Sequence, residues 1–501
     1  MTSLPGDPGI RALDRLTSDC LDLLVIGGGI VGSGVARDAA LRGLRVGLVE
    51  QHDFAFGTSS RSSRLLHGGL RYLAQYEFGL VREASLEKRI LAHIAPHLAR
   101  PLGFVFPAYR GDGPPLWQLR IGVKLYDLLC SGRNFAPSRV LSLPTTQELL
   151  PGLRRAHLRG AVRYFDALTN DARLVIDTLR SAARAGAGVV NYARLVSAER
   201  AGSEWKAQVH DRLSGGSASI TTRAIVNATG PWSDQLPHSA VRLRLTKGIH
   251  LVFDARRIPV PSAVVITSGK RILFVLPWSD RVIIGTTDTD YRGPPEAVTV
   301  ETADVDYVLR TVNEYFPRVQ LTPSDVISAW AGLRPLVANP DGTPSDLSRA
   351  HEITSPEPGW WDITGGKLTT YRLMAEQTVD AIVRTLRLKV APCRTAVELL
   401  LSPGDVTPFS CVAQPPCSEE AVGHYVKNEW AVHLSDVILR RSGWHYHERP
   451  ETLPVDRIAT WMAQAAGWSS ARRAEEMKAY HTEVSSFAVP PPARPVGVST
   501  P

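Results

Sequence analysis

Five cationic side chains stand where they could bind an anionic ligand. Arg71 lies in "HGGLRY", Arg334 in "GLRPL" and Lys367 in "GGKLTT", so each of these three is set in a glycine-containing stretch. Arg271 begins "RILFV" and Arg349 lies in "LSRAHEI". Arginine presents a planar fork of N–H groups that matches the oxygens of a phosphate. The alternative is an ordinary surface ion pair, and it has more weight for Arg271 and Arg349, which lack the apolar and glycine-rich context of the others.

A glycine motif near the start of the chain predicts dinucleotide binding. The apolar run "LDLLVIGGG" leads into Gly27-x-Gly29-x-x-Gly32, which opens an alanine-rich helix beginning at Ile30. In this motif the first glycine permits a tight turn, the second lets the backbone approach a pyrophosphate, and the third packs the helix on the strand. Unpaired N–H groups at the helix start attract the anion. The next apolar run, "RVGLVE", ends at Glu50, which is placed to accept hydrogen bonds from ribose hydroxyls.

Three observations favour FAD over a nicotinamide nucleotide. The motif lies at the N-terminal end of a long chain, and no second GxGxxG follows. Two later turns, "NATGPW" and "TGGKLTTYR", each follow an apolar run, as expected of backbone loops that close on one extended cofactor. With the "GLRPL" stretch they supply further expected cofactor contacts: Ala228, Gly230, Trp232, Gly332, Gly366, Lys367, Leu368, Thr369 and Thr370.

The loop 57–69 carries a run of small hydrogen-bonding side chains. Its hydroxyls are those of Thr58, Ser59, Ser60, Ser62 and Ser63. With the backbone N–H groups they could hold the pyrophosphate and ribityl parts of FAD. His67 precedes Gly68 and Gly69, and two glycines allow the backbone to come close to a flat ring. A polar loop without a ligand is the alternative interpretation.

Three residues are candidates for the general base that removes a proton from the hydroxyl group of a substrate. They are His67, His250 in "KGIHLVF", and Lys367 acting through a water molecule. A histidine whose pKa is about 6.5 suits this task. A single histidine on a strand, such as His250, is more often structural. All three candidates stay open at this point.

Composition excludes several classes of protein. The 501 residues carry a net charge of +8, and the arginines form no dense basic run, so we expect no nucleic-acid partner. The five cysteines include no CxxC pair, so neither a metal site nor a disulfide framework is expected. We find no secretory signal and no apolar run long enough to cross a membrane, and we expect a cytoplasmic protein.

One helix differs from the rest. Residues 116–130 are nearly all apolar except for a stripe formed by Arg120, Lys124 and Asp127. Such a helix is either buried in the protein or pressed against lipid. Both interpretations stay open.

The motifs, in their order along residues 21–385, resemble those of the FAD-dependent glycerol-3-phosphate dehydrogenases, within the D-amino-acid-oxidase-like flavoproteins. The resemblance rests on "VIGGGIVGSGVARDAALRG", "TSSRSSRLLHGGLRYL", "NDARLV", "VNATGPW", "TKGIHLVF", "RILFVLPW", "IIGTTDTDY", "AGLRPLV" and "GGKLTTYR". The first motif indicates only the wider group, whereas "HGGLRYL", "GLRPL" and "GGKLTTYR" are more specific. The C-terminal helices look like a diverged form of the family's helical domain.

The resemblance implies an α/β fold, α+β overall. It has a Rossmann-like FAD-binding domain, an antiparallel-sheet substrate domain and a C-terminal helical domain. It also implies oxidation of sn-glycerol 3-phosphate to dihydroxyacetone phosphate by hydride transfer from C2 to N5 of non-covalently bound FAD. Electrons would pass to a membrane quinone, with the protein peripheral on the membrane surface. The expected catalytic residues are His67, Arg71, Arg334 and Lys367. The expected substrate-binding residues are Arg71, Tyr72, His250, Arg271, Arg334, Arg349 and Lys367.

We divide the chain as follows. Residues 1–20 form an N-terminal extension, and 21–75, 150–230 and 330–388 form a discontinuous FAD-binding domain. Residues 76–149 and 231–329 form the substrate-binding or capping domain, with helices that could face a membrane. Residues 395–487 form the C-terminal helical domain, and 488–501 a disordered tail. A homodimer stays open.

Other functions are compatible with the same motifs. An oxidase on this scaffold would use O₂ and release peroxide. Oxidation of another small hydroxy acid or amine is less consistent with the cluster of Arg71, Arg334 and Lys367, because a carboxylate needs fewer cations. A non-enzymatic flavin-binding subunit is the remaining alternative.

Overall fold

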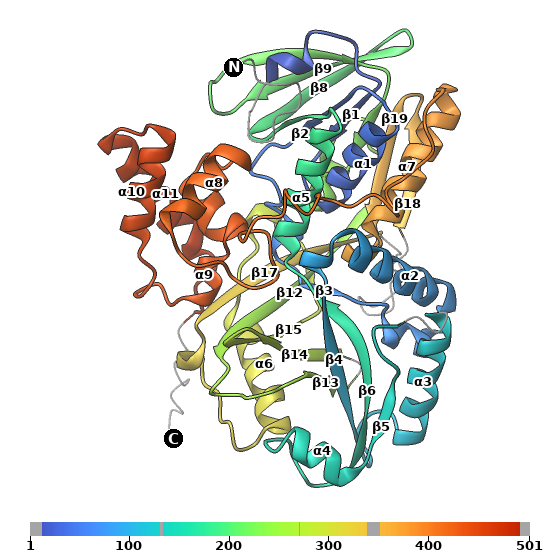
Figure 1. The fold of residues 1–501 in the computed structure, drawn as a ribbon, viewed down its shortest axis with the longest axis vertical. Helices are drawn as coiled ribbons and strands as arrows, with labels where there is room; N and C mark the ends of the chain where they lie inside the picture. The colour runs from blue at the N-terminus through green and yellow to red at the C-terminus, as the bar shows by residue number, and fades with distance from the viewer. Residues whose placement is uncertain (1–12, 131–133, 270, 338–350, 491–501) are drawn as a thin grey trace, which may run out of the picture.

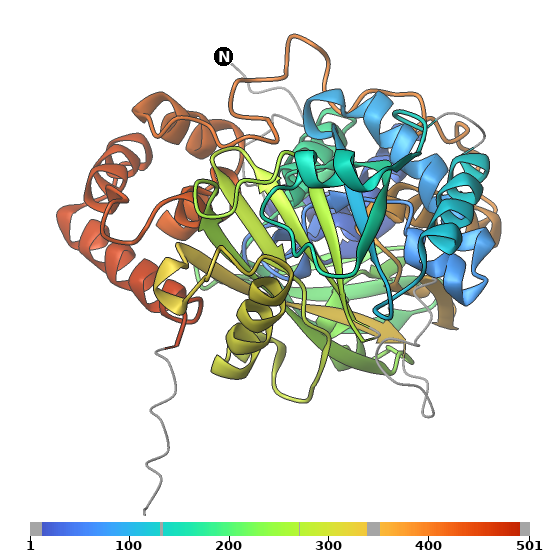
Figure 2. The ribbon, with the colours of Figure 1, turned by 90° about the horizontal axis from the view of Figure 1, so that it is seen from below.

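The computed structural model describes residues 13–130, 134–269, 271–337 and 351–490, and it contains two main sheets (Figure 1). The smaller sheet, with β1, β2 and β19, lies in the upper half of Figure 1, and the larger sheet lies below it. Helices α2 (Phe78–Ile94) and α3 (Leu116–Leu129) lie on one side of the molecule, and the C-terminal helices lie on the other. Figure 2 shows the same separation of the two helical groups from below.

The smaller sheet has the order β18-β19-β11-β1-β2-β7. Its strands are β1 (Leu23–Ile26), β2 (Val46–Val49), β7 (Gly188–Val190), β11 (Ile225–Asn227), β18 (His351–Glu357) and β19 (Trp360–Gly365). All pairs are parallel except β18 with β19. β1 and β2 are fully buried apolar runs, as parallel strands covered on both faces require. The edge strand β18 is largely exposed.

Helices α1 (Ile30–Leu41), α5 (Asp171–Arg184) and α7 (Tyr371–Leu386) belong to this sheet and share one apolar core with it. Helix α1 packs against both α5 and α7. The side chain of Asn170 caps α5 by accepting a hydrogen bond from the Arg173 N–H at 3.2 Å. This confirms the Rossmann-like part of the predicted fold.

The larger sheet is mostly antiparallel, with the order β16-β12-β15-β14-β13-β4-β6-β3 and with β17 and β5 paired to β12 and β6. Its strands are β3 (Leu65–Leu66), β4 (Arg100–Tyr109), β5 (Arg139–Leu141), β6 (Leu158–Leu168), β12 (Leu243–Asp254), β13 (Ala263–Ser268), β14 (Arg271–Trp278), β15 (Arg281–Gly285), β16 (Thr289–Tyr291) and β17 (Ser328–Val337). Helices α4 (Leu143–Leu149) and α6 (Thr302–Tyr315) lie near its outer end (Figure 1). A third, three-stranded sheet joins β8 (Ala193–Ala201), β9 (Glu204–Asp211) and β10 (Ser217–Thr222).

The strands do not follow the predicted domain limits everywhere. β6 lies within the stretch 150–230, and β17 lies within 330–388 apart from its first two residues, yet both pair in the larger sheet. Each strand therefore connects the predicted FAD-binding and substrate domains. Of the predicted N-terminal extension, residues 13–16 form a short 3-10 helix, η1 (Leu13–Leu16), in which Leu16 is buried. Residues 491–501 of the predicted disordered tail lie outside the described residues.

The C-terminal helices are α8 (Glu419–Asn428), the π-helical segment η9 (Asp436–Arg441), α9 (Trp444–His447), α10 (Val455–Ala466) and α11 (Ser470–Ser485). Their core is continuous with part of the larger sheet, because Tyr446 and Leu439 pack in the same apolar cluster as Trp330 and Trp278. None of the described helices is both long and apolar enough to cross a membrane.

Candidate active site

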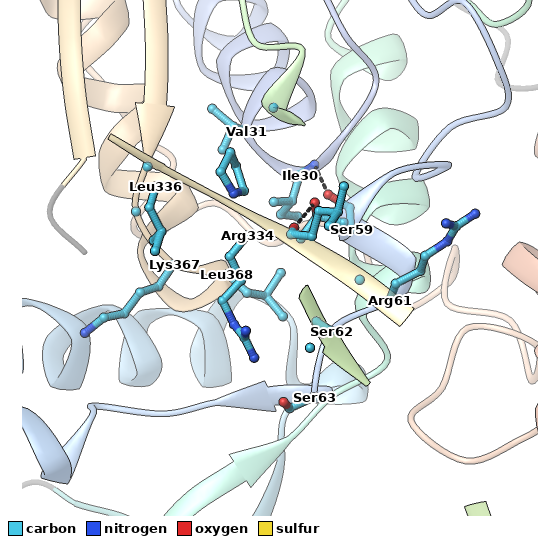
Figure 3. A pocket seen from close by; sticks show the side chains of 18 of the residues that line it. Ile30, Val31, Ser59, Arg61, Ser62, Ser63, Arg334, Leu336, Lys367 and Leu368 are labelled. Carbon is cyan, nitrogen blue, oxygen red and sulfur yellow. Dashed lines mark hydrogen bonds between the residues drawn. The ribbon is translucent and has the colours of Figure 1, made fainter. Parts of the chain in front are cut away.

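A cavity of about 1450 Å³ lies between the two main sheets and is walled by segments from distant parts of the sequence. Figure 3 shows residues of α1, the loop 58–63, β17 and the turn after β19, which together line the cavity. Most predicted residues line this cavity: Gly27, Gly29, Ile30, Glu50, Thr58, Ser59, His67, Gly69, Arg71, Ala228, Gly230, Trp232, His250, Arg271, Gly332, Arg334, Gly366, Lys367 and Leu368. The structure thus brings together residues that the sequence holds far apart.

The glycine turn after β1 leaves room for a ligand only because it lacks side chains. Gly27 has a φ of +108°, and a Cβ placed on it would lie 2.6 Å from the Ala228 carbonyl oxygen. A Cβ on Gly32 would lie 2.0 Å from the Gly27 carbonyl oxygen, so Gly32 packs α1 on the turn and does not line the cavity. The start of α1 reaches the cavity wall at Gly29, Ile30 and Val31, and the N-terminal end of a helix attracts an anion.

Two side chains hold this turn in place. The Ser59 Oγ accepts a hydrogen bond from the Ile30 N–H at 3.0 Å (Figure 3). The Glu50 carboxylate accepts hydrogen bonds from the Gly28 N–H at 2.7 Å and the His52 N–H at 2.9 Å. Burial raises the pKa of the Glu50 carboxyl. Glu50 thus fixes the turn as well as lining the cavity at the position predicted to meet the ribose.

These features fit FAD. A dinucleotide site needs a glycine turn, a helix start, hydroxyl groups and a carboxylate. The cavity wall has all four: the turn in which added Cβ atoms would clash, the start of α1, the hydroxyls of the neighbouring loop and the carboxylate at the end of β2. Thr58 lines the cavity, although its Oγ1 donates to the Leu333 carbonyl oxygen at 2.6 Å. Ser60 is buried behind the loop and does not line the cavity.

The His67–Gly69 segment presents mostly backbone to the cavity. The His67 N–H donates to the Thr369 Oγ1 at 3.0 Å, and the same hydroxyl donates to the His67 carbonyl oxygen at 3.2 Å. Gly69 has a φ of +81°, and a Cβ there would lie 2.4 Å from the Tyr72 ring. Gly68 and Thr369 lie behind the cavity wall, so their effect on a ligand is indirect. Thr370, at the start of α7, also lies behind it.

Two cations flank one aromatic ring at the cavity. The Lys367 Nζ lies 4.0 Å from the centroid of the Tyr72 ring, and the Arg71 Cζ lies 4.8 Å from it. The Arg71 Nη2 also donates to the Tyr72 hydroxyl at 3.0 Å. Arg71 and Lys367 line the cavity, whereas Tyr72 is 3% exposed and does not line it. Tyr72 therefore positions the two cations and does not itself reach the ligand space.

Arg334 is the best-held cation of the site. Its guanidinium donates to the Thr286 Oγ1 at 2.8 Å and pairs with the Asp288 carboxylate at 3.2 Å. Both partners line the cavity and belong to the "IIGTTDTDY" stretch, whose site residues sequence analysis did not single out. Arg271 also lines the cavity, and its guanidinium lies 5.3 Å from the Tyr307 ring. The predicted Arg349 lies outside the described residues.

His250 is held as a neutral side chain. It is 3% exposed, its Nε2 is 2.8 Å from the Ser63 Oγ, and its ring stacks on Trp330 at 5.0 Å. Burial, with the nearby Arg334 and Arg64 charges, lowers the pKa of His250 to about 3. A group that binds a proton so weakly is a poor general base, which favours His67 or Lys367 for that task.

The C-terminal helices hold the loop behind the nucleotide turn. The Arg441 guanidinium donates to both oxygens of the Asp53 carboxylate, each at 2.8 Å, and the Arg440 Nε donates to the same carboxylate at 2.6 Å. All three side chains are buried. The loop 51–57, which contains Asp53, contributes Gln51, His52, Phe56 and Gly57 to the cavity wall. We call Asp53, Arg440 and Arg441 the domain clamp.

Two arginines of the predicted cofactor loop also meet the C-terminal helices. The Arg61 Cζ lies 5.4 Å from the Phe56 ring and 5.1 Å from the Phe487 ring. The Arg64 Cζ lies 4.3 Å from the Trp278 ring and 5.3 Å from the Tyr446 ring. Their charges are thus used for packing the loop against aromatic rings.

Comparison with known proteins identifies the family. Residues 22–380 match the model of the DAO family, described as FAD dependent oxidoreductases. The chain belongs to this family. This FAD-dependent oxidoreductase is 41% identical over 406 residues to "Glycerol-3-phosphate dehydrogenase 2" of Mycobacterium tuberculosis, covering 79% of this chain and 68% of the relative. It is 35% identical over 531 residues to "Glycerol-3-phosphate dehydrogenase" of Mycobacterium leprae, covering 95% and 90% of the two chains.

A solved structure covers nearly the whole oxidoreductase. The glycerol-3-phosphate dehydrogenase from Bacillus halodurans complexed with FAD superposes with a TM-score of 0.76 and 28% identity, covering 97% of this chain and 98% of that one. The match extends beyond the FAD-binding sheet, so the C-terminal helices have a counterpart in that protein. FAD is accordingly the cofactor for which the glycine turn of this chain is built.

Proposed function

We propose that this oxidoreductase is a glycerol-3-phosphate dehydrogenase that oxidises sn-glycerol 3-phosphate to dihydroxyacetone phosphate and passes electrons to a membrane quinone. The observation that carries the proposal is the set of cations on the cavity wall. Arg71, Arg271, Arg334 and Lys367 all line the space that the glycine turn also lines. A phosphate dianion needs several fixed cations, whereas a carboxylate or an amine needs fewer.

Each residue of the site has a separate task in this proposal. FAD, when bound, accepts a hydride from C2 of the substrate. Arg334 holds a phosphate oxygen, because its fork is already oriented by Thr286 and Asp288. Arg71 and Lys367, which both contact the Tyr72 ring, supply further positive charge.

Proton removal from the substrate hydroxyl falls to His67 or to Lys367 acting through water. Both residues line the cavity. His250 orients Ser63 and supports the wall as a neutral ring.

Anaerobic addition of glycerol 3-phosphate to the yellow holoprotein tests the proposal. We expect the flavin absorbance to bleach, and a quinone analogue to restore it. If millimolar glycerol 3-phosphate leaves the spectrum unchanged, the proposal is wrong. Peroxide formed during turnover in air, measured against reduction of the quinone analogue, distinguishes a dehydrogenase from an oxidase.

We further propose that the outer face of α3 lies on a membrane surface. Trp117 is 66% exposed and Leu128 is 72% exposed, while Leu119 and Val123 on the opposite face are buried. One face of α3 is thus buried in the protein, and its opposite face is exposed. Exposed Tyr76 and Ile121 lie at the cavity wall, so the cavity reaches the same apolar surface. A membrane quinone could enter the cavity across this apolar surface.

Sedimentation with vesicles containing anionic lipid tests this attachment. The double variant Trp117→Gln with Leu128→Gln is expected to stay in the supernatant while the wild type pellets. Val196→Gln, which changes an exposed apolar residue of the cavity wall on β8 rather than on α3, is the control and is expected to pellet. Equal pelleting of all three proteins would contradict the attachment.

A further inference from the structure

A buried polar cluster lies behind the His67–Gly69 segment, away from the cations of the site. Its members are Lys88 on α2, Tyr126 on α3 and Asp166 on β6, and each is at most 2% exposed. Only Asp166 also reaches the cavity wall. Burying a lysine and a carboxylate costs free energy that their pairing does not reliably recover. A buried cluster next to an active-site loop therefore calls for a role beyond stability.

The cluster ends on a backbone N–H of the active-site loop. The Tyr126 hydroxyl donates to the Asp166 Oδ1 at 2.5 Å, and its oxygen accepts the Gly68 N–H at 3.0 Å. The same N–H makes a longer contact of 3.3 Å with the Asp166 Oδ1. The Lys88 Nζ donates to the same Asp166 Oδ1 at 2.8 Å and to the Phe165 carbonyl oxygen at 3.0 Å. The hydroxyl is thus donor and acceptor at once. Phenylalanine would have the same shape and could do neither.

Gly68 also fits tightly against the two helices. A Cβ on Gly68 would lie 2.4 Å from the Ser85 Oγ and 2.4 Å from the Tyr126 hydroxyl oxygen. On the other side, Thr369 holds the backbone of His67 at both its N–H and its carbonyl group. The segment is therefore held between Thr369 and the cluster, and its position is set by both.

Tyr126 remains a donor at physiological pH. Burial, together with the nearby Asp166 charge, raises the pKa of Tyr126 well above its ordinary value. The direction of each hydrogen bond is therefore fixed: the Tyr126 O–H donates to Asp166, and its oxygen accepts from the Gly68 N–H. A chain of hydrogen bonds with fixed directions orients a peptide more firmly than a bond to mobile solvent.

We propose that Lys88, Tyr126 and Asp166 are positioning residues of the active site, which hold the Gly68 peptide and thereby set where His67 and Gly69 stand at the cavity wall. The inference rests on the proposed function for its kinetic consequence. Its structural consequence, the placement of the wall beside bound FAD, does not depend on the substrate. Displacement of a site residue by about 1 Å can cost about 100-fold in rate.

Tyr126→Phe in the holoprotein tests the proposal. We expect kcat with glycerol 3-phosphate and a quinone analogue to fall about 10- to 100-fold, while KM changes much less, because the variant touches none of the substrate cations. We also expect the visible absorption bands of bound FAD to shift in the absence of substrate. A role in stability alone would leave both the bands and kcat of the folded protein unchanged.

Tyr425→Phe is the matched control. Tyr425 is fully buried like Tyr126, but its hydroxyl has no hydrogen-bond partner among the described residues, and it lies in the C-terminal helices. Removal of that hydroxyl is expected to leave kcat and the flavin bands unchanged. The pair of variants thus separates loss of this hydrogen-bond chain from loss of any buried hydroxyl.

The outcomes are distinct. A Tyr126→Phe holoprotein with wild-type kcat and unshifted flavin bands would overturn the positioning role. If the wild type itself is not reduced by glycerol 3-phosphate, the proposed function fails, and the flavin bands alone then decide the positioning role. Should Tyr126→Phe not fold, Lys88→Met replaces it, because Lys88 does not line the cavity and its loss removes the hydrogen bonds to Asp166 and to the Phe165 carbonyl oxygen. Wild-type kcat and unshifted bands in that variant would equally overturn the proposal.

Discussion

Replacement of Arg441 by methionine is the sharpest test of the domain clamp. The change removes two hydrogen bonds of 2.8 Å to the Asp53 carboxylate and one of 3.0 Å to the Glu429 carbonyl oxygen. Asp53 stays buried with Arg440 as its ionic partner. Methionine keeps most of the apolar stem and much of the volume. Loss of the charge, rather than loss of packing, therefore dominates the effect.

The expected cost follows from the burial of the clamp. A hydrogen bond to a charged group contributes about 1.5–3 kcal/mol, so two contribute about 3–6 kcal/mol. Removal of one partner from a buried ion pair costs about 3–5 kcal/mol by a separate estimate. The two ranges agree on a destabilisation of about 3–5 kcal/mol. With a denaturant slope of about 3 kcal/mol per M of urea, the unfolding midpoint falls by about 1–1.7 M.

Urea unfolding followed by intrinsic tryptophan fluorescence measures this cost. Arg244→Met is the control, because Arg244 forms an equally short pair with Asp290 at 2.7 Å on the exposed surface. We expect the control to keep the wild-type midpoint, since exposed pairs are weak. A midpoint for Arg441→Met equal to that of the control would refute the reasoning.

The difference between wild type and Arg441→Met should also depend on pH. Burial alone would raise the pKa of Asp53, but the Arg441 and Arg440 charges outweigh it and hold that pKa below its ordinary value of 3.8. A group whose folded pKa is depressed adds stability above its unfolded pKa and loses it as the pH falls through the folded value. The gap between the two midpoints should therefore shrink below about pH 4, and a constant gap down to pH 2 would contradict the assignment.

Three further changes test the site itself. Gly32→Ala places a Cβ against the Gly27 carbonyl, and overpacking of this kind costs about 1–3 kcal/mol. Because the clash displaces the turn that holds FAD, titration with FAD should show about 5- to 150-fold weaker binding. His250→Asn loses the hydrogen bond to Ser63, which is worth about 0.5–1.5 kcal/mol, so kcat/KM should fall about 2- to 12-fold. The dependence of kcat/KM on pH should keep its shape above about pH 5, because His250 is already neutral there. Arg334→Lys loses the planar fork, so kcat/KM should fall about 10- to 150-fold, mainly through KM; an unchanged KM for glycerol 3-phosphate would remove this residue from phosphate binding.

The local parts of the fold follow from the sequence. The spacing of Gly27, Gly29 and Gly32 between two apolar runs predicts the strand, turn and helix that the structure contains, because glycine spacing and helix packing act within thirty residues. Most predicted site residues also come together at one cavity. The motifs that contain these residues adopt their backbone conformation locally, so the chemistry of these residues can be predicted from the sequence without the tertiary structure.

Long-range pairing could not be predicted in the same way. β6 and β17 have the alternating or apolar pattern of any half-buried strand, and that pattern does not say which distant strand each will pair with. The dipeptide Arg440–Arg441 looks like a surface pair in "VILRRSG", since burial of charge is invisible until Asp53 is placed beside it. Tyr126 likewise sits in a helix that sequence alone left between burial and lipid contact.

The way the cavity is assembled has a consequence for synthesis of the chain on the ribosome. Gly27 and Leu368 both line the cavity, so a nascent chain cannot complete the FAD site until residue 368 has emerged. Arg440 and Arg441, which hold the loop behind the nucleotide turn, appear later still. FAD uptake is therefore a late event, and a newly made chain that meets too little FAD keeps an open apolar cavity between two finished sheets. Cofactor supply would then determine how many chains survive proteolysis rather than how many are made.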